Sequence, residues 1–103
     1  MAATPEARVK KAVRKVLEEV GAYSFWPVQM GLGARTVDVL VCHKSKFFGF
    51  EIKAPGEKPT ALQSLCMRKI REAGGETLVI DSVEMAGHLK DWLEIHTAED
   101  VLE

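Results

Sequence analysis

Two apolar segments that flank the polar residues 43–46 (His-Lys-Ser-Lys) constrain the fold of this chain most strongly. Valines occupy alternate positions in residues 36–42, and phenylalanine or isoleucine occupies alternate positions in residues 47–53. A period of two is typical of strands with one buried face. The pattern therefore predicts an antiparallel hairpin with a loop at 43–46 and its apolar face on a core.

This hairpin carries an acid on each strand. A four-residue loop pairs Cys42 with Phe47, and counting down the ladder then puts Asp38 opposite Glu51, with Cβ atoms about 5 Å apart. Lys53 follows Glu51 by two residues and shares its face. Two facing carboxylates repel unless a cation lies between them, and both the Lys53 ammonium and a divalent metal ion fit that place.

The remaining elements are predicted from caps and periodicity. Thr4 and Pro5 begin a helix that Gly21 ends, and residues 23–26 form a first strand. Thr60 and Gln63 form a capping box that opens a second helix, whose predicted buried stripe is Leu62, Leu65, Cys66, Ile70 and Ala73. We expect a buried strand at 77–80, a last helix from Asp81 or Ser82 to about Ile95, and a frayed tail over 95–103.

The predicted element order is α-β-β-β-α-β-α, an α/β fold with a mixed central sheet flanked by helices. The chain of 103 residues has room for a single domain over 1–103, and 47% hydrophobic with 28% charged residues is ordinary for a soluble protein. It shows no apolar run long enough for a membrane span and no signal peptide. Cys42 and Cys66 lie in apolar surroundings, which predicts buried, reduced thiols in a cytosolic protein.

Charge is distributed unevenly along the chain. The net charge of −1 argues against a protein that coats nucleic acid by charge alone. Residues 1–60 hold ten Lys/Arg and six Asp/Glu, a net of +4, and residues 61–103 hold four and nine, a net of −5. The basic half therefore contains the Glu51–Lys53 stretch.

Asp38, Glu51 and Lys53 together suit metal-assisted hydrolysis of a phosphodiester. Mg²⁺ is a hard cation that prefers oxygen ligands and keeps several waters, so two carboxylates can hold it beside a phosphate. The main-chain carbonyl of Ile52 is the best candidate to complete the ligand shell. Lys53 could orient or deprotonate the attacking water, or stabilise the developing negative charge.

The pattern Asp38…Glu51-x-Lys53 resembles the catalytic signature of the PD-(D/E)xK nuclease superfamily. The flanking segments are similar to its VRR-NUC branch (virus-type replication-repair nucleases), particularly the small stand-alone phage members. The resemblance covers roughly residues 4–84, and Val37 stands where the family usually has proline. The similar segments are Gly31-Leu32-Gly33, residues 51–56, Lys58-Pro59-Thr60 with Gln63, and residues 73–75.

The resemblance implies a PD-(D/E)xK nuclease-like core and a Mg²⁺- or Mn²⁺-dependent deoxyribonuclease with no organic cofactor and no membrane partner. Asp38 and Glu51 would be metal ligands, Lys53 the catalytic lysine, Gln63 a glutamine near the site, and Glu6 an acid that reaches the metal through water. Stand-alone members are typically homodimers that cut branched DNA such as four-way (Holliday) junctions, whereas the domain in larger proteins cuts flaps. A phage- or prophage-encoded member would work in the bacterial cytoplasm.

Plainer interpretations accompany each of these residues. Glu51 and Lys53 alone could be a surface ion pair worth less than about 1 kcal/mol. Gln63 is also explained by the capping box, and Glu6 by the helix dipole. Trp26 and Trp92 fit a core or an interface better than a base-stacking platform. Candidate phosphate contacts are Lys10, Lys11, Arg14, Arg35, Lys44, Lys46 and Lys58, each of which could equally be a solvated cation.

Two other functions stay open beside a junction nuclease. One is a catalytically silent DNA-binding or assembly module with the same fold. The other is a restriction-type endonuclease that cuts one short sequence in linear duplex DNA.

Overall fold

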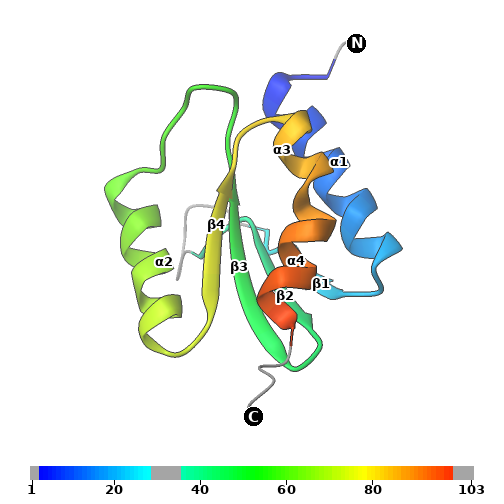
Figure 1. Ribbon diagram of the computed structural model, residues 1–103. Coiled ribbons are helices and arrows are strands. Elements are labelled where there is room, and N and C mark those ends of the chain that lie inside the picture. The colour runs from blue at the N-terminus through cyan, green and yellow to red at the C-terminus, as the bar shows by residue number, and fades with distance from the viewer. Residues whose placement is uncertain (1–2, 29–35, 99–103) are drawn as a thin grey trace.

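The computed structural model describes residues 3–28 and 36–98, and its four strands form one sheet in the order β1-β2-β3-β4 (Figure 1). The first three strands are antiparallel neighbours and β4 runs parallel to β3, so the sheet is mixed, as predicted. The elements are α1 (Pro5–Glu19), β1 (Tyr23–Phe25), β2 (Val39–His43), β3 (Lys46–Ile52), α2 (Ala61–Glu72), β4 (Glu76–Ile80), α3 (Val83–Gly87) and α4 (Leu89–Thr97).

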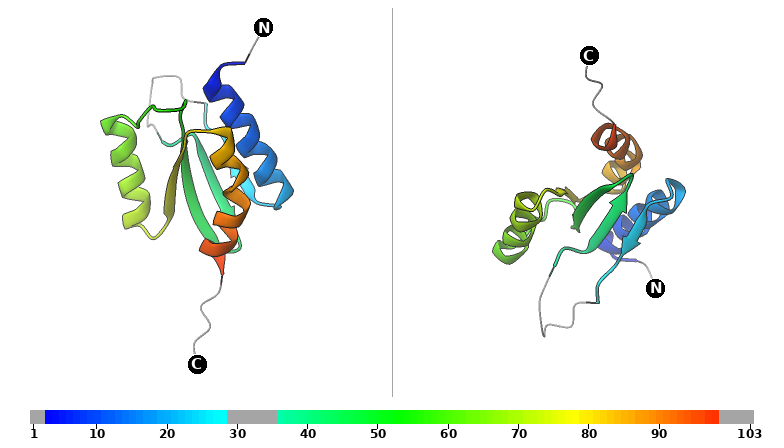
Figure 2. Two further views of the ribbon diagram at one scale, coloured as in Figure 1. Left: turned by 45° about the horizontal axis from the view of Figure 1, so that its top comes forward. Right: turned by 90° about the horizontal axis from the view of Figure 1, so that it is seen from below.

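Helices cover the two faces of the sheet unequally. Figures 1 and 2 show α1, α3 and α4 packed together on one face, and α2 alone on the other beside β3 and β4. The main core lies under the three helices, where Phe48 and Phe50 both place their rings against Trp92, with centroids 5.6 and 5.7 Å away. The buried members of this core are Val9, Val13, Leu17, Val39, Val41, Phe48, Phe50, Ile52, Ile80, Ala86, Leu89 and Leu93.

The hairpin of β2 and β3 has the predicted register. Val39 pairs with Phe50 and Val41 pairs with Phe48, all on the core face. The turn is tighter than predicted, because His43 pairs with Lys46 and only Lys44 and Ser45 are left to turn the chain. Both of those residues have positive φ, 50° and 68°, as a two-residue type I′ turn requires. The extra pair extends the ladder at its closed end and leaves the register unchanged.

Side-chain caps fix where α1 and α2 begin. The Thr4 hydroxyl accepts a hydrogen bond from the Ala7 N–H at 3.1 Å, with Pro5 at the first helical position, as predicted. Thr60 and Gln63 form the predicted capping box at the start of α2. These caps put Glu6 and Gln63 in the first turns of their helices, at the end of the sheet where β3 finishes.

The end of the chain differs from the prediction. The last helix divides at His88 into α3 and α4, directly after Gly87, because glycine weakens a helix interior. The expectation of fraying from residue 95 is wrong for residues 95–97, which belong to α4. There the buried Thr97 hydroxyl donates to the Leu93 carbonyl at 2.7 Å. Residues 99–103 lie outside the described part.

The face covered by α2 is less buried than predicted. Leu62 is 66% exposed and Leu65 is also exposed, whereas Met67 is the buried residue of this helix. Cys42 is exposed rather than buried, and Cys66 is half-buried. The prediction that Leu62, Leu65 and Ala73 are buried is wrong, because α2 flanks the sheet and leaves this side of the helix in solvent.

Within the described ranges, the structure has no helix whose length and apolar character would let it cross a membrane.

Candidate active site

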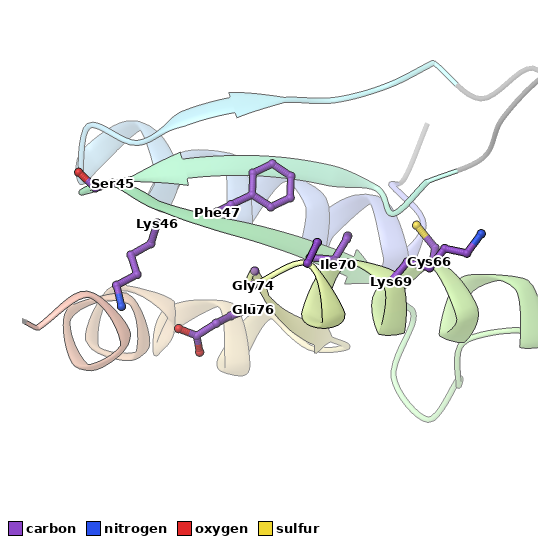
Figure 3. A pocket seen from close by; sticks show the side chains of 10 residues that line it. Ser45, Lys46, Phe47, Cys66, Lys69, Ile70, Gly74 and Glu76 are labelled. Atoms are coloured by element: carbon purple, nitrogen blue, oxygen red, sulfur yellow. The ribbon is translucent and has the colours of Figure 1, made fainter.

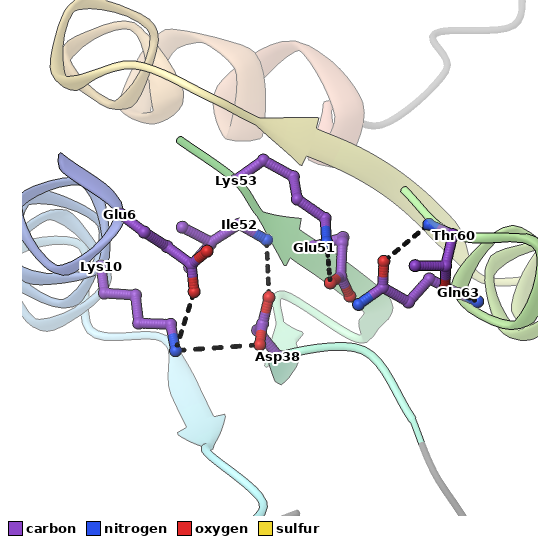
Figure 4. Close-up of polar contacts among 8 residues, drawn as sticks. All are labelled: Glu6, Lys10, Asp38, Glu51, Ile52, Lys53, Thr60 and Gln63. Carbon is purple, nitrogen blue, oxygen red and sulfur yellow. Dashed lines mark hydrogen bonds and ion pairs between the residues drawn. The ribbon is translucent and has the colours of Figure 1, made fainter. Parts of the chain in front are cut away.

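Glu51 is a buried acid near the end of β3. Its neighbours Phe50 and Ile52 point into the main core, so Glu51 points to the opposite face of the sheet. The residue is only 1% exposed. One carboxylate oxygen, Oε2, lies 3.7 Å from the Lys53 ammonium (Figure 4). The other, Oε1, is buried and has no hydrogen-bond partner among the described residues.

Asp38 lies one residue before β2, and extending the observed register by one step puts it opposite Glu51. Its Oδ2 accepts a hydrogen bond from the Ile52 N–H at 2.8 Å. Its Oδ1 lies 3.9 Å from the ammonium of Lys10, a residue of α1. Asp38 is therefore anchored by the backbone of β3 on one side and by α1 on the other.

The surroundings of Glu51 perturb its ionisation. The pKa of Glu51 is raised to about 8, chiefly by burial and then by the nearby Asp38 carboxylate, while Lys53 opposes the shift. Without an added cation, Glu51 therefore holds its proton at neutral pH. A cation placed between the two acids would favour the ionised form.

These residues fit a divalent cation. A buried, unpartnered carboxylate oxygen is costly unless something binds it, and Glu51 Oε1 and the Asp38 carboxylate are the hard oxygen donors that Mg²⁺ or Mn²⁺ accepts. The N–H and C=O of one strand residue point to the same edge, so the Ile52 carbonyl faces the side of Asp38. No group of three His, Cys, Asp or Glu side chains forms a metal cluster in the part of the chain described.

Glu6 is linked to this site through Lys10 rather than directly. Its Oε2 lies 3.5 Å from the Lys10 ammonium, which also faces Asp38. Figure 4 shows Lys10 between the two acids. Glu6 therefore stands at the rim of the site, half-exposed and one cation away from Asp38.

Gln63 uses one end of its amide for the capping box, because its Oε1 accepts the Thr60 N–H at 2.8 Å. Figure 4 shows the Gln63 side chain extending from α2 toward Glu51. The capping role and a place beside the site are thus compatible.

The remaining basic candidates lie at different distances from Asp38 and Glu51. Lys46 stands five residues before Glu51 in β3, about 16 Å along the strand, and Lys44 is in the turn beyond it. Both lie at the far end of the hairpin. Lys58 is exposed in the loop after β3, and Lys11 and Arg14 are exposed on α1. Arg35 and the Gly31-Leu32-Gly33 segment lie outside the described residues.

A cavity of about 580 Å³ lies elsewhere, between α2 and the closed half of the hairpin (Figure 3). Its lining includes Phe47, Cys66 and Ile70 but none of Asp38, Glu51 and Lys53. The acids instead lie at the end of the sheet, outside this cavity.

Sequence reasoning did not connect Lys10 with Asp38. The spacing of Glu6 and Lys10 by four residues indicates their ion pair, but the contact with Asp38 depends on how α1 crosses the sheet.

Comparison with solved structures shows a clear likeness in fold. No protein-family model matches the sequence, and no curated protein matches it. A solved structure described as "VRR_NUC domain" matches with a TM-score of 0.73 and 24% sequence identity, covering 86% of this chain and 97% of that one. The fold of this chain is therefore that of a VRR_NUC domain, a small α/β fold with a mixed sheet flanked by helices, as the sequence predicted.

Replacing Glu51 by glutamine should remove a pH dependence of stability. Unfolded Glu51 loses its proton near pH 4.5 and folded Glu51 near pH 8, so in metal-free buffer its contribution to wild-type stability is lost as pH rises across that window. The melting temperature of Glu51→Gln relative to wild type should therefore increase from pH 5 to pH 8.5. Exposed Glu57→Gln is the control and should show no trend. A difference in melting temperature between Glu51→Gln and wild type that stays constant with pH would contradict the raised pKa of Glu51.

Proposed function

We propose that this chain is a VRR-NUC nuclease that hydrolyses phosphodiester bonds of DNA with Mg²⁺ or Mn²⁺. The observation that carries the proposal is the buried, unpartnered oxygen of Glu51, beside Asp38 and within ion-pair distance of Lys53. An acid buried at such cost at the end of a strand is typical of a functional site. The fold shared with a VRR_NUC domain supports the same conclusion.

Asp38, Glu51 and the Ile52 carbonyl would hold the ion, with Glu6 reaching it through water. When bound, the ion lowers the pKa of a coordinated water and neutralises charge on the scissile phosphate. Asp38 is held ready for this role by the Ile52 N–H, which leaves its other oxygen toward Lys10. Glu51 would contribute Oε1, the buried oxygen that has no hydrogen-bond partner within residues 3–28 and 36–98.

Lys53 acts on the water or on the phosphate. Its side chain is only 13% exposed and its ammonium lies 3.7 Å from Glu51 Oε2, so it is confined near the two acids. From that position it orients or deprotonates the attacking water, or stabilises the negative charge that develops on the phosphate. Gln63 has its amide nitrogen available to position water or substrate, because its oxygen caps α2.

The substrate we propose is branched DNA, such as a four-way junction or a flap, recognised through its backbone and shape. The position of the acids at an end of the sheet suits a long polymer better than a small molecule enclosed in a cavity. The chain would act as a single nuclease domain in the cytoplasm of a bacterial host.

The direct test is cleavage of a synthetic four-way junction with Mg²⁺ or Mn²⁺. Lys53→Ala should lower the rate by at least about 100-fold, the usual size of a proton-transfer or charge-stabilising contribution, with folding intact. Lys90→Ala removes an exposed lysine of α4, which belongs neither to the site nor to the candidate phosphate contacts, and should leave the rate nearly unchanged.

Other outcomes of that test identify the alternatives. Wild-type protein that binds junctions but never nicks them would be a DNA-binding module. Cleavage confined to one short sequence in linear duplex would make it a restriction-type endonuclease.

We further propose a homodimer that presents one site to each of two strands. Tyr23, Cys42 and Phe47 form one row across three strands on the face that carries α2, and Phe25 lies in the next row. Tyr23 is 71%, Phe25 53% and Phe47 46% exposed. Exposed aromatic groups of this kind mark interaction surfaces, and a second copy would bury them.

Sedimentation velocity tests the dimer. Wild type should sediment as a dimer at micromolar concentration, and Phe25→Glu should shift it toward the monomer with its melting behaviour retained. A monomeric wild type, or a dimer unaffected by the substitution, would contradict the proposed surface.

A further inference from the structure

One row of α1 leads from the acids onto the neighbouring surface. Glu6, Lys10 and Arg14 recur every four residues, so they lie along one side of the helix. The row begins at the site, because Lys10 lies 3.5 Å from Glu6 and 3.9 Å from Asp38. Figure 4 shows Lys10 in contact with both Glu6 and Asp38.

Arg14, the third member, is held against an aromatic ring. Its guanidinium carbon lies 4.1 Å from the centroid of Trp26. Trp26 directly follows β1, and extending the observed register puts it level with Val39, the residue after Asp38. The cation–π pair therefore belongs to the same end of the sheet as the acids.

Trp26 is a support for Arg14 rather than a free platform. Its ring packs against the main core, and its indole N–H donates to the Ser24 hydroxyl at 3.3 Å. Arg14 covers the ring from outside, and within the described residues no carboxylate pairs with it. The ring contact orients the planar guanidinium and leaves its edge donors for an external acceptor.

We propose that a strand of the DNA substrate leaves the site along this side of α1, with successive phosphates on Lys10 and Arg14. The two cations are one helical turn apart, a rise of about 6 Å, which suits neighbouring phosphates on one strand. Lys10 supplies a mobile point charge beside the acids, and Arg14 supplies a pre-oriented fork. This inference rests on the proposed nuclease function, and it specifies the surface along which the bound strand leaves the site.

The same helix provides a matched control. Lys11 and Lys15 have the same spacing and charge, but they lie about 100° further round α1, away from Asp38 and Trp26. Arg14→Gln and Lys15→Gln therefore remove one charge each from positions that are adjacent in sequence.

Binding of a four-way junction is measured in the Lys53→Ala background with Mg²⁺, so that the DNA stays intact. Arg14→Gln should weaken binding several-fold and reduce the slope of log K against log salt by about 0.7 to 0.9, as for one lost phosphate contact. Lys15→Gln should change neither quantity appreciably. Arg14→Lys keeps the charge and should recover most of the slope, which a purely structural role of Arg14 would not predict.

A methylphosphonate scan then locates the contact. Neutralising one phosphate near the cut should weaken binding by the Arg14-containing protein and have no further effect on Arg14→Gln. The proposed path along α1 would be wrong if Arg14→Gln left the slope of log K against log salt unchanged. It would also be wrong if both proteins responded equally to neutralisation of every phosphate. In either case, cleavage by the wild-type protein would still support the nuclease function. Wild-type protein that neither binds nor cuts the junction would instead overturn both proposals.

Discussion

The site depends on burying Glu51 in a strand whose alternate side chains build the core. Phe50 and Ile52 are fully buried on the other face, so the position of the Glu51 carboxylate cannot change without disturbing that packing. Burial makes ionisation of this acid unfavourable, and Lys53 compensates only in part. The fold therefore keeps this carboxyl group buried at some expense of its own stability, and the proposed cation would offset that cost.

The hairpin positions the second acid, Asp38, through the same packing of alternate side chains on the core. Once Val39 pairs with Phe50 on the core face, Asp38 has to stand at the end of the ladder, where it accepts the Ile52 N–H. α1 then brings Lys10 to the other side of Asp38. Two acids and two lysines from three segments thus meet at one end of the sheet, and the basic row of α1 continues outward from them.

Much of this was predictable from alternation and caps. The register that places Asp38 opposite Glu51 follows from the apolar residues alone, because a slip of one residue would put Phe48 and Phe50 on the opposite face of the sheet from Val39 and Val41. The caps at Thr4 and Thr60 were predictable for a similar local reason. The contacts of Lys10 with Asp38 and of Arg14 with Trp26 were not, since they depend on how α1 crosses the sheet. The exposure of Leu62 likewise depends on how little of the sheet α2 covers, and the division of the last helix at His88 had only Gly87 as a local signal.

The most direct measurement is a crystal of the wild-type protein soaked in Mn²⁺ above pH 8, where Glu51 is ionised. Anomalous density should appear between the carboxylates of Asp38 and Glu51, within bonding distance of both. A fully soaked crystal with no such peak, or with manganese bound only at other surface acids, would contradict the claim that these two residues form a metal site.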